Sequence, residues 1–387
     1  MCCGMALDRR RFVTVAAGLA AFGLRGMAQS PGPIRRAAVI GHTGRGDYGH
    51  GLDGIFRDRS GIELVGIADP NPAGRAKAAK AAGAPRSYAD WREMLEREKP
   101  QLVSIAMRHA DQHAEVALGC LRVGAHLYME KPFVRSPDEA DAVLKEAEAR
   151  GLRIAVAHTM RMTPVMQKLR RAVSKGLIGD LREMRAFGKQ DARAGGEDLM
   201  VLGTHLFDLM RMFAGDPLWV GGRVLQQGRP VTVSDRRRVK DDVGWVAGDQ
   251  VFAQFGFPGG VHATFTSDAR LRETTGHWGI EFHGSKGVVR MNADIEPQVF
   301  VRSTTGWSTG GRVDTWKPFD EEAVKSPPEH NRAPVEDWLE AIRQGREPEC
   351  SGRNGAWAVE MVSGVYASAL NGGRVELPLK ARAHPLG

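Results

Sequence analysis

The strongest constraint on the fold is an alternation of short apolar segments with amphipathic segments between residues 36 and 158. The apolar segments have the length and composition of buried strands, and they are residues 36–41, 63–70, 101–107, 125–132 and 152–158. The segments with helical spacing are residues 51–60, 72–83, 111–124 and 137–150. Because strands that alternate with helices form parallel sheets, the pattern predicts a doubly wound α/β domain.

The pattern changes near residue 180, where strand-like segments come in succession. These segments are residues 181–189, 219–226, 249–257, 260–268, 278–284 and 287–292. Helical segments precede and follow them, and the last are residues 335–344 and 356–370, before a short strand at 375–379. Successive strands favour a mostly antiparallel sheet. We therefore expect two α/β domains, residues 34–157 and residues 158–387.

Composition places the chain among soluble globular proteins. Its 387 residues are 42% hydrophobic and 26% charged, which excludes disordered and collagen-like classes. The 54 basic and 46 acidic residues give a net charge of +8, but apart from a run at 236–238 the basic residues are scattered without interleaved aromatic residues. We therefore expect no nucleic-acid partner. The four cysteines form neither a disulfide framework nor a CxxC motif, and no metal is predicted.

The first 28 residues resemble a twin-arginine export signal. Arg9, Arg10, Arg11 and Phe12 precede the apolar run VTVAAGLAAFGL, and the small residues around Ala28 fit a signal-peptidase site. The run is shorter than the roughly 20 residues of a membrane span, and no other segment is long enough. We therefore predict cleavage near Ala28, a periplasmic or otherwise exported protein, and no stable membrane insertion. The alternatives are a basic start of a cytosolic chain and an uncleaved anchor.

A glycine-rich loop, VIGHTGRGDYGHG, follows the first predicted strand directly. In this position glycines allow backbone N–H groups to approach a pyrophosphate. A literal GxGxxG pattern starts at Gly44, whereas the register that starts at the strand end has a threonine in place of the middle glycine. The predicted cofactor residues of the loop are Gly41, Thr43, Gly44, Arg45 and Gly46. The alternative is a glycine-rich loop with a purely structural role.

The second predicted strand ends at Asp69, 28 residues after Gly41. An acid there accepts hydrogen bonds from the adenosine ribose and repels a 2′-phosphate, so it favours NAD. Arg75 nearby leaves NADP as an alternative, and a turn residue before Pro70 is the structural interpretation of Asp69.

Four further segments resemble, in order and spacing, the Gfo/Idh/MocA family of sugar and polyol oxidoreductases. They are LVSIAMRHADQHAEVAL, YMEKPF, GTHLFDLMR and SALNGGRVELPL. The resemblance covers nearly all of the chain after the leader. It implies an N-terminal NAD(P)-binding Rossmann domain and a C-terminal α/β domain with a large, mostly antiparallel open sheet. Because that sheet often mediates assembly in the family, we expect a homodimer or homotetramer.

The resemblance also implies the catalytic residues. Lys131 is expected beside the nicotinamide, where it hydrogen-bonds the substrate hydroxyl that is oxidised. Glu130 is expected to contact the cofactor region and orient the lysine, and Pro132 to follow a cis peptide. His205 is expected to accept the hydroxyl proton, with a buried core histidine as the structural alternative.

One position departs from the family, because Val201 stands where an aspartate commonly precedes the histidine by four residues. In one continuous helix Asp198, seven residues before His205, faces nearly the same direction, and we predict that it supplies a carboxylate to the substrate pocket. Asp208 is a second candidate for a contact with His205. Alternatively, Glu197 and Asp198 only cap the helix.

The remaining candidates surround the predicted cleft. Two residues are predicted to bind substrate, Arg161 and Asp208. Two from the turn after residues 101–107 are predicted to contact the cofactor or cap a helix, His109 and His113. Those that either line the cleft or have structural roles are His158, Arg185 and Lys189. Two histidines on sheet positions lack metal-like spacing, His277 and His283.

Export affects the expected chemistry, because no free NAD(H) pool regenerates a released cofactor outside the cytoplasm. We therefore expect an oxidoreductase that retains its cofactor while acting on a sugar or polyol hydroxyl. The first alternative is a redox-neutral NAD-dependent glycoside hydrolase, in which a transient ring carbonyl acidifies the neighbouring C–H. The second alternative is a non-catalytic sugar-binding protein of the same fold.

Overall fold

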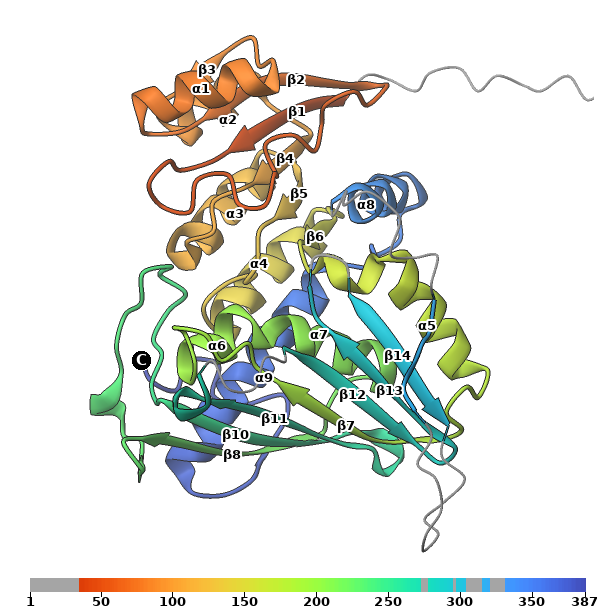
Figure 1. Cartoon of the computed structure of the whole chain (residues 1–387). Helices are drawn as coiled ribbons and strands as arrows, with labels where there is room; N and C mark the ends of the chain where they lie inside the picture. The colour runs from red at the N-terminus through yellow and green to blue at the C-terminus, as the bar shows by residue number, and fades with distance from the viewer. Residues whose placement is uncertain (1–34, 273–277, 295–296, 304–314, 321–330) are drawn as a thin grey trace, which may run out of the picture. The chain divides into compact units, whose positions relative to one another are not determined.

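The computed structural model describes residues 35–272, 278–294, 297–303, 315–320 and 331–387. The predicted leader, residues 1–28, and His277 lie outside these ranges. Within the described ranges, no helix combines the length and the apolar character that a membrane span requires. Figure 1 shows two sheets with helices around each.

The first sheet consists of six parallel strands in the order β3-β2-β1-β4-β5-β6. The strands are β1 Arg35–Ile40, β2 Ile62–Ala68, β3 Ser87–Tyr88, β4 Leu102–Ile105, β5 His126–Met129 and β6 Ile154–Val156. Every pair of neighbouring strands within it is parallel. The order reverses between β1 and β4, which makes the crevice at their carboxyl ends the expected ligand position. The predicted Rossmann domain is confirmed.

Helices connect these strands where the sequence supplies end signals. They are α1 Pro72–Ala82, α2 Trp91–Glu98, α3 His113–Arg122 and α4 Pro137–Ala149. The side chain of Asn71 accepts from the N–H of Gly74 at 2.9 Å and caps α1, which ends at Gly83 with a φ of 69°.

The helix expected at residues 51–60 does not form. The N–H of Gly54 reaches back only three residues, to the carbonyl of Gly51, and Arg57 bonds Gly54 in the same way. Gly51, with a φ of 82°, and Asp58, with a φ of 56°, have left-handed backbone conformations that interrupt a right-handed helix. The segment is a series of turns.

The second sheet is mostly antiparallel, as predicted, with the order β15-β14-β13-β12-β7-β11-β10-β8-β16 and β9 paired to β8. Its strands are β7 Leu181–Phe187, β8 Trp219–Gln226, β9 Arg229–Pro230, β10 Gln250–Gly256, β11 His262–Asp268, β12 Gly279–Gly284, β13 Gly287–Asn292, β14 Gln298–Ser303, β15 Lys317–Pro318 and β16 Val375–Glu376. The pair β7 and β11 is parallel.

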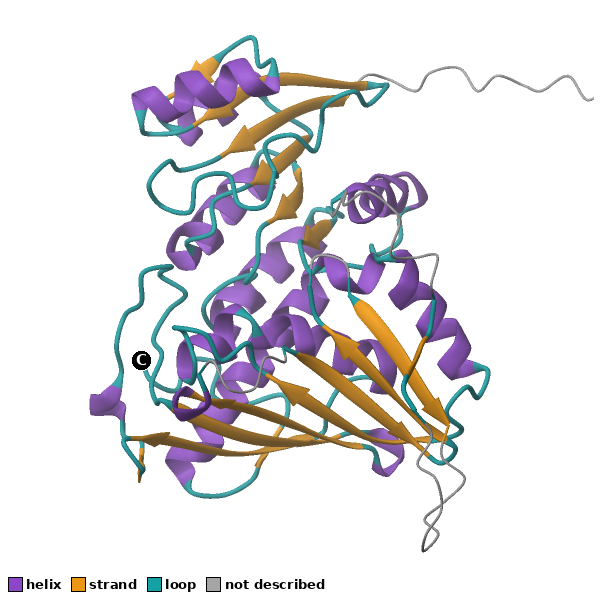
Figure 2. Ribbon diagram, in the orientation of Figure 1, coloured by secondary structure: helices purple, strands orange, loops and turns teal. Residues whose placement is uncertain are grey.

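Helices cover one face of this sheet (Figure 2). They are α5 Pro164–Ser174, α6 Gly196–Val201, α7 Gly203–Ala214 and α9 Gly352–Asn371. The remaining helix, α8 Arg332–Gln344, packs against β5 and β6 of the first sheet. Phe207 of α7 packs edge-on against Phe255 and Phe265, with ring centroids 5.3 and 5.2 Å away. A Cβ on Gly222 of β8 would lie 2.5 Å from the carbonyl oxygen of Val365, so this glycine lets α9 approach the sheet closely.

The continuous helix expected to hold both Asp198 and His205 is interrupted. It consists of α6 and α7, with a break at Leu202, whose φ is −118° and ψ −32°. Asp198 and His205 therefore belong to different helices. The expectation that they face the same direction fails for this reason.

Candidate active site

A cavity of about 300 Å³ lies where the carboxyl end of β5 meets the junction of α6 and α7. Side chains from both halves of the chain line it, including Arg108, Lys131, Lys189, His205, Asp241 and Trp278. The two residues that the sequence predicts to handle protons, Lys131 and His205, therefore share one cavity.

Lys131 follows β5 and precedes a cis peptide bond to Pro132. The side chain is buried, and its Nζ donates to the main-chain carbonyl of Val201 at 3.3 Å. Burial lowers the pKa of the ammonium, while the charge of Glu130 opposes this shift. Loss of the proton therefore needs less alkaline solution than it does for an ordinary lysine.

Glu130 is fully buried and joins the lysine to the glycine-rich loop. One carboxylate oxygen accepts from the N–H of Lys131 at 2.8 Å. The other accepts from the N–H of His50 at 3.0 Å and lies 2.6 Å from its Nδ1. Burial alone would raise the pKa of Glu130, but the hydrogen bond from His50 and the charge of Lys131 hold it below its usual range. Glu130 thus binds the backbone of Lys131.

His205 lies in α7 with its Nδ1 buried and without a hydrogen-bond partner among the described residues. Its ring lies edge-on to Trp278, with centroids 5.8 Å apart, and to His158, at 5.4 Å. Burial, reinforced by the nearby charge of Lys131, places the pKa of His205 well below its ordinary value. The imidazole is therefore neutral near pH 7 and can accept a proton.

Asp198 does not reach this cavity, which corrects the prediction that it supplies a carboxylate there. It is fully buried in α6. Its carboxylate accepts from Ser267 Oγ at 2.6 Å and from the N–H groups of Lys189 and Gln190 at 3.2 and 3.0 Å. Burial raises its pKa. The carboxylate joins α6 to two neighbouring segments of chain.

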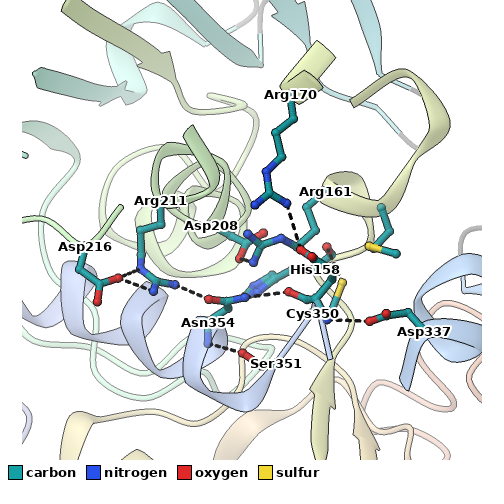
Figure 3. Close-up of polar contacts among 12 residues, drawn as sticks. His158, Arg161, Arg170, Asp208, Arg211, Asp216, Asp337, Cys350, Ser351 and Asn354 are labelled. Carbon is teal, nitrogen blue, oxygen red and sulfur yellow. Dashed lines mark hydrogen bonds and ion pairs between the residues drawn. The ribbon is translucent and has the colours of Figure 1, made fainter. Parts of the chain in front are cut away.

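Arg161 and Asp208 form a buried ion pair away from the cavity, with 2.8 Å between Nη1 and Oδ1 (Figure 3). Their side chains are 6% and 1% exposed, and neither lines the cavity. The structure therefore corrects both predictions for Asp208, because it neither contacts His205 nor faces the substrate. Arg161 is corrected as a substrate ligand for the same reason.

His158 is also buried beside this ion pair (Figure 3). Its main-chain carbonyl accepts from Cys350 Sγ at 3.6 Å, and neither ring nitrogen has a partner within the described ranges. Burial lowers the pKa of His158 to about 4. The ring of His158 packs edge-on against the ring of His205, and His158 does not line the cavity.

The glycine-rich loop lies at the carboxyl end of β1, as the sequence predicts. Gly44 has a φ of 86° and open space where a Cβ would be, while a Cβ on Gly46 would lie 2.7 Å from the backbone nitrogen of Arg108. Thr43 packs so closely on Gly74 of α1 that a Cβ there would lie 1.9 Å from its hydroxyl oxygen. Gly41 is covered by the ring of Tyr48.

Asp69 follows β2, where the acid that binds the adenosine ribose is expected. It is fully buried, and Oδ2 accepts from the N–H of Thr43 at 3.1 Å, from its hydroxyl at 2.6 Å and from the hydroxyl of Tyr48 at 2.8 Å. Oδ1 accepts from the N–H of Asn71 at 2.8 Å. Because each carboxylate oxygen accepts about two hydrogen bonds, Oδ1, which accepts one, keeps an acceptor site for the predicted ribose contact. Arg75 donates to the carbonyl of Asp69 and not to its carboxylate.

Arg45 is held by residues of two other loops. Its guanidinium donates to Asp111 at 2.9 Å, to Asp242 at 2.5 Å and to Nδ1 of His109 at 3.4 Å. Potential metal-ligand atoms of His109, Asp111 and Asp242 lie within 4.8 Å of one another. Because the Arg45 guanidinium bonds both carboxylates, their negative charge is already compensated by a cation of the protein.

His113 has a structural position, which corrects its assignment as a cofactor ligand. It is fully buried at the start of α3. Its ring nitrogens lie 2.9 Å from the carbonyl oxygen of Pro132 and 2.8 Å from that of Met107. The ring therefore links the segments that follow β4 and β5.

The other three candidates, Lys189, Arg185 and His283, differ in whether they line the cavity. Lys189 lines the cavity, whereas Arg185 pairs with Glu183 on β7 at 2.7 Å. His283 pairs with Glu281 on β12 at 3.0 Å. Only the first of the three can meet a ligand in the cavity.

The cavity residues that were not predicted include His50, Arg108, Asp241 and Trp278. A signal existed for Arg108, because it follows the third predicted strand at the ligand-binding edge. His50 stands inside the glycine-rich segment itself. Asp241 and Trp278 come from connections in the second half of the chain, where no pattern marks their approach to Lys131.

Comparison with known proteins identifies the family. An oxidoreductase family profile for an NAD-binding Rossmann fold matches residues 35–158, and one for the C-terminal alpha/beta domain matches residues 182–377. The chain therefore belongs to the Gfo/Idh/MocA family of oxidoreductases.

The chain is similar to several dehydrogenases. It is 26% identical to D-apiose dehydrogenase of Paraburkholderia graminis over 333 residues, 83% of this chain and 85% of the relative. It is 25% identical to levoglucosan dehydrogenase of Pseudarthrobacter phenanthrenivorans over 61% of this chain and 66% of the relative. A solved levoglucosan dehydrogenase in complex with NADH and L-sorbose superposes with a TM-score of 0.72 at 21% identity, covering 89% of this chain and 99% of that one.

NAD is the cofactor of the Rossmann domain. The residues present fit it. Gly44 leaves open space at the end of β1, and Asp69 places a carboxylate at the end of β2. Lys131 and the cavity lie further along the same edge, beyond the point where the strand order reverses.

Proposed function

We propose that this protein is an NAD-dependent dehydrogenase that oxidises a hydroxyl group of a sugar or polyol, with Lys131 and His205 handling the proton. The observation that carries the proposal is that these two side chains, one just after β5 and one in α7, line one cavity at the ligand-binding edge of the Rossmann sheet. The names of the similar D-apiose and levoglucosan dehydrogenases support a sugar as the substrate class.

The two residues have complementary roles in this reaction. The His205 imidazole is neutral because burial lowers its pKa, so it accepts the proton of the substrate hydroxyl. The Lys131 ammonium donates a hydrogen bond to the same oxygen and stabilises the negative charge that develops on it. NAD, when bound, accepts the hydride from the carbon that carries this oxygen.

The surroundings hold these groups in place. Glu130 fixes the backbone of Lys131, and the carbonyl of Val201 holds its ammonium. The ring of Trp278 packs edge-on against the ring of His205. Fixed neighbours reduce the rearrangement needed when the substrate arrives.

We further propose that the protein is exported and retains its cofactor. The support is the resemblance of residues 1–28 to a twin-arginine signal, since an exported enzyme meets no pool of free NAD(H). The same observation favours a second candidate function, a redox-neutral glycoside hydrolase that restores its cofactor in every turnover.

Mass spectrometry of the nucleotide released on denaturing the exported protein is the first test. Nearly one NAD per chain is expected for a retained cofactor. Hydride transfer to added acceptor sugars then supports the dehydrogenase, while glycoside cleavage without added NAD supports the hydrolase. A protein that is empty and binds neither NAD(H) nor NADP(H) would contradict both and favour a non-catalytic sugar-binding protein.

A further inference from the structure

The diphosphate-binding region lacks an element that Rossmann domains normally supply. In these domains the helix after the first strand directs free N–H groups and the positive end of its dipole at the pyrophosphate. Here residues 41–61, all of which the structure describes, form turns and no helix. The positive potential for a diphosphate must therefore come from other groups near the loop.

Arg108 occupies a suitable position. It lies just beyond β4, and its backbone nitrogen and Cβ would both lie 2.7 Å from a Cβ on Gly46 of the loop after β1. It thus stands at the switch point between β1 and β4, where dinucleotides cross a sheet of this order. It also lines the cavity that contains Lys131.

The guanidinium of Arg108 has no internal use in the described part of the chain. Its Nε is buried without a hydrogen-bond partner, and no ion pair to a described carboxylate involves it. Burying an unsatisfied donor is unfavourable. A guanidinium that stays unpaired beside a glycine-rich loop therefore points to an anionic ligand, because its fork of N–H groups matches phosphate oxygens.

Arg45, in the loop after β1, differs in this respect. It is bonded to both Asp111 and Asp242, which already compensate its charge. Lys131 is held by the Val201 carbonyl, beyond β5 and further from β1 in the sheet. Arg57, further along the segment after β1, donates to the main-chain carbonyl of Ala81. Among the described arginines of the loops after β1 and β4, Arg108 is the one whose Nε is buried without a hydrogen-bond partner.

We propose that Arg108 binds the diphosphate of the dinucleotide and replaces the missing helix N-terminus. The inference rests on the proposed NAD-dependent function. It assigns cofactor recognition partly to a charged side chain after β4, in addition to the backbone of the glycine-rich loop.

The test measures binding of ADP-ribose, which carries the diphosphate but no nicotinamide, so turnover does not enter. Isothermal titration calorimetry on the full chain compares wild type with Arg108→Gln. We expect the Kd for ADP-ribose to rise at least about tenfold, because a charge-assisted bidentate contact is lost. Adenosine, assayed by competition, should bind the variant as it binds wild type. Arg108→Lys should lie between the two, since it keeps the charge and loses the fork.

Arg92→Gln is the matched control, because it removes one arginine from α2, where Arg92 contacts Asp90 and Glu115. It should leave the Kd for ADP-ribose unchanged. Unchanged ADP-ribose affinity in a folded Arg108→Gln protein would overturn the inference, and equal losses for adenosine and ADP-ribose would overturn it as well. Failure of the wild type to bind ADP-ribose or NADH would instead remove the proposed function.

Discussion

The Nζ of Lys131 lies 3.3 Å from the main-chain carbonyl oxygen of Val201, the position where the family commonly has an aspartate. A carbonyl accepts a hydrogen bond without carrying a full charge. The lysine is thus held in place while burial still lowers its pKa. The proposed catalytic pair therefore has no carboxylate at position 201 and keeps an oriented ammonium.

Placing a carboxylate at position 201 should shift the pH dependence of kcat/KM. In Val201→Asp, a negative charge near both groups raises the pKa of His205 and of Lys131, because it favours their protonated forms. Both limbs of the kcat/KM profile should then move to higher pH, by about one unit. Val201→Asn is the neutral control. An equal shift in that variant would show that the change is not electrostatic.

Removal of the lysine should abolish most of the activity. Lys131→Ala leaves no group to stabilise the charge that develops on the substrate oxygen, and kcat should fall by about 10²- to 10⁴-fold. Steady-state kinetics gives the loss, and circular dichroism verifies the fold. Wild-type turnover by a folded variant would be incompatible with the proposed role.

Asp198 should be structural. Asp198→Asn keeps the shape but places an amide against Ser267 and two N–H groups, so the free energy of unfolding should fall by about 1–3 kcal/mol. Measured on folded protein, kcat should stay close to that of wild type. Ser267→Ala provides a milder control, since it removes only one of the three donors. A large loss of kcat in stable Asp198→Asn protein would show that this residue contributes to catalysis.

Breaking the Arg161 and Asp208 pair should be more costly. Asp208→Ala leaves a buried guanidinium without its partner and should reduce the free energy of unfolding by about 3–5 kcal/mol, measured by urea titration. Glu93→Ala breaks the exposed pair with Arg97 and should cost about 1 kcal/mol or less. Equal effects of the two substitutions would mean that the buried pair contributes no more than a surface pair.

His158 should make the protein sensitive to acid. Its pKa is about 4 when folded against an ordinary 6.5, so between these values the unfolded chain binds a proton that the folded chain does not. Stability should therefore fall as pH decreases from 6.5 to 4, by up to about 3 kcal/mol from this group. In urea titrations at pH 7 and 4.5, His158→Phe should show a smaller difference than wild type. His262→Phe, at a half-exposed position, should retain the full difference.

The sequence predicted the architecture well because strand and helix periodicity directly encode which faces are buried. The predictions failed where local conformation decides the outcome. Left-handed residues such as Gly51 and Asp58 prevent the helix at 51–60, and an irregular backbone at Leu202 separates α6 from α7. Neither feature changes the hydrophobic pattern.

The site was only partly predictable. Motif order predicted that Lys131 and His205 serve one site, and the two do line one cavity. The prediction was possible because Lys131 follows a clear strand pattern and His205 lies within a clear helical pattern. Motif order could not identify the partners of Asp198 and Asp208, since Ser267 and Arg161 lie 69 and 47 residues away in sequence. Which buried polar groups meet across a fold depends on packing, and spacing along the chain does not encode it.

The burial of Glu130 limits how far the Glu-Lys-Pro motif can be transplanted by protein engineering. Its carboxylate depends on His50 from another loop, and a Cβ on Gly49 would lie 2.4 Å from Oε1. A host scaffold given only the tripeptide would bury an uncompensated acid, and even one methyl group at position 49 would compete for the same space. A transplant would therefore need the tripeptide together with the loop that contains Gly49 and His50.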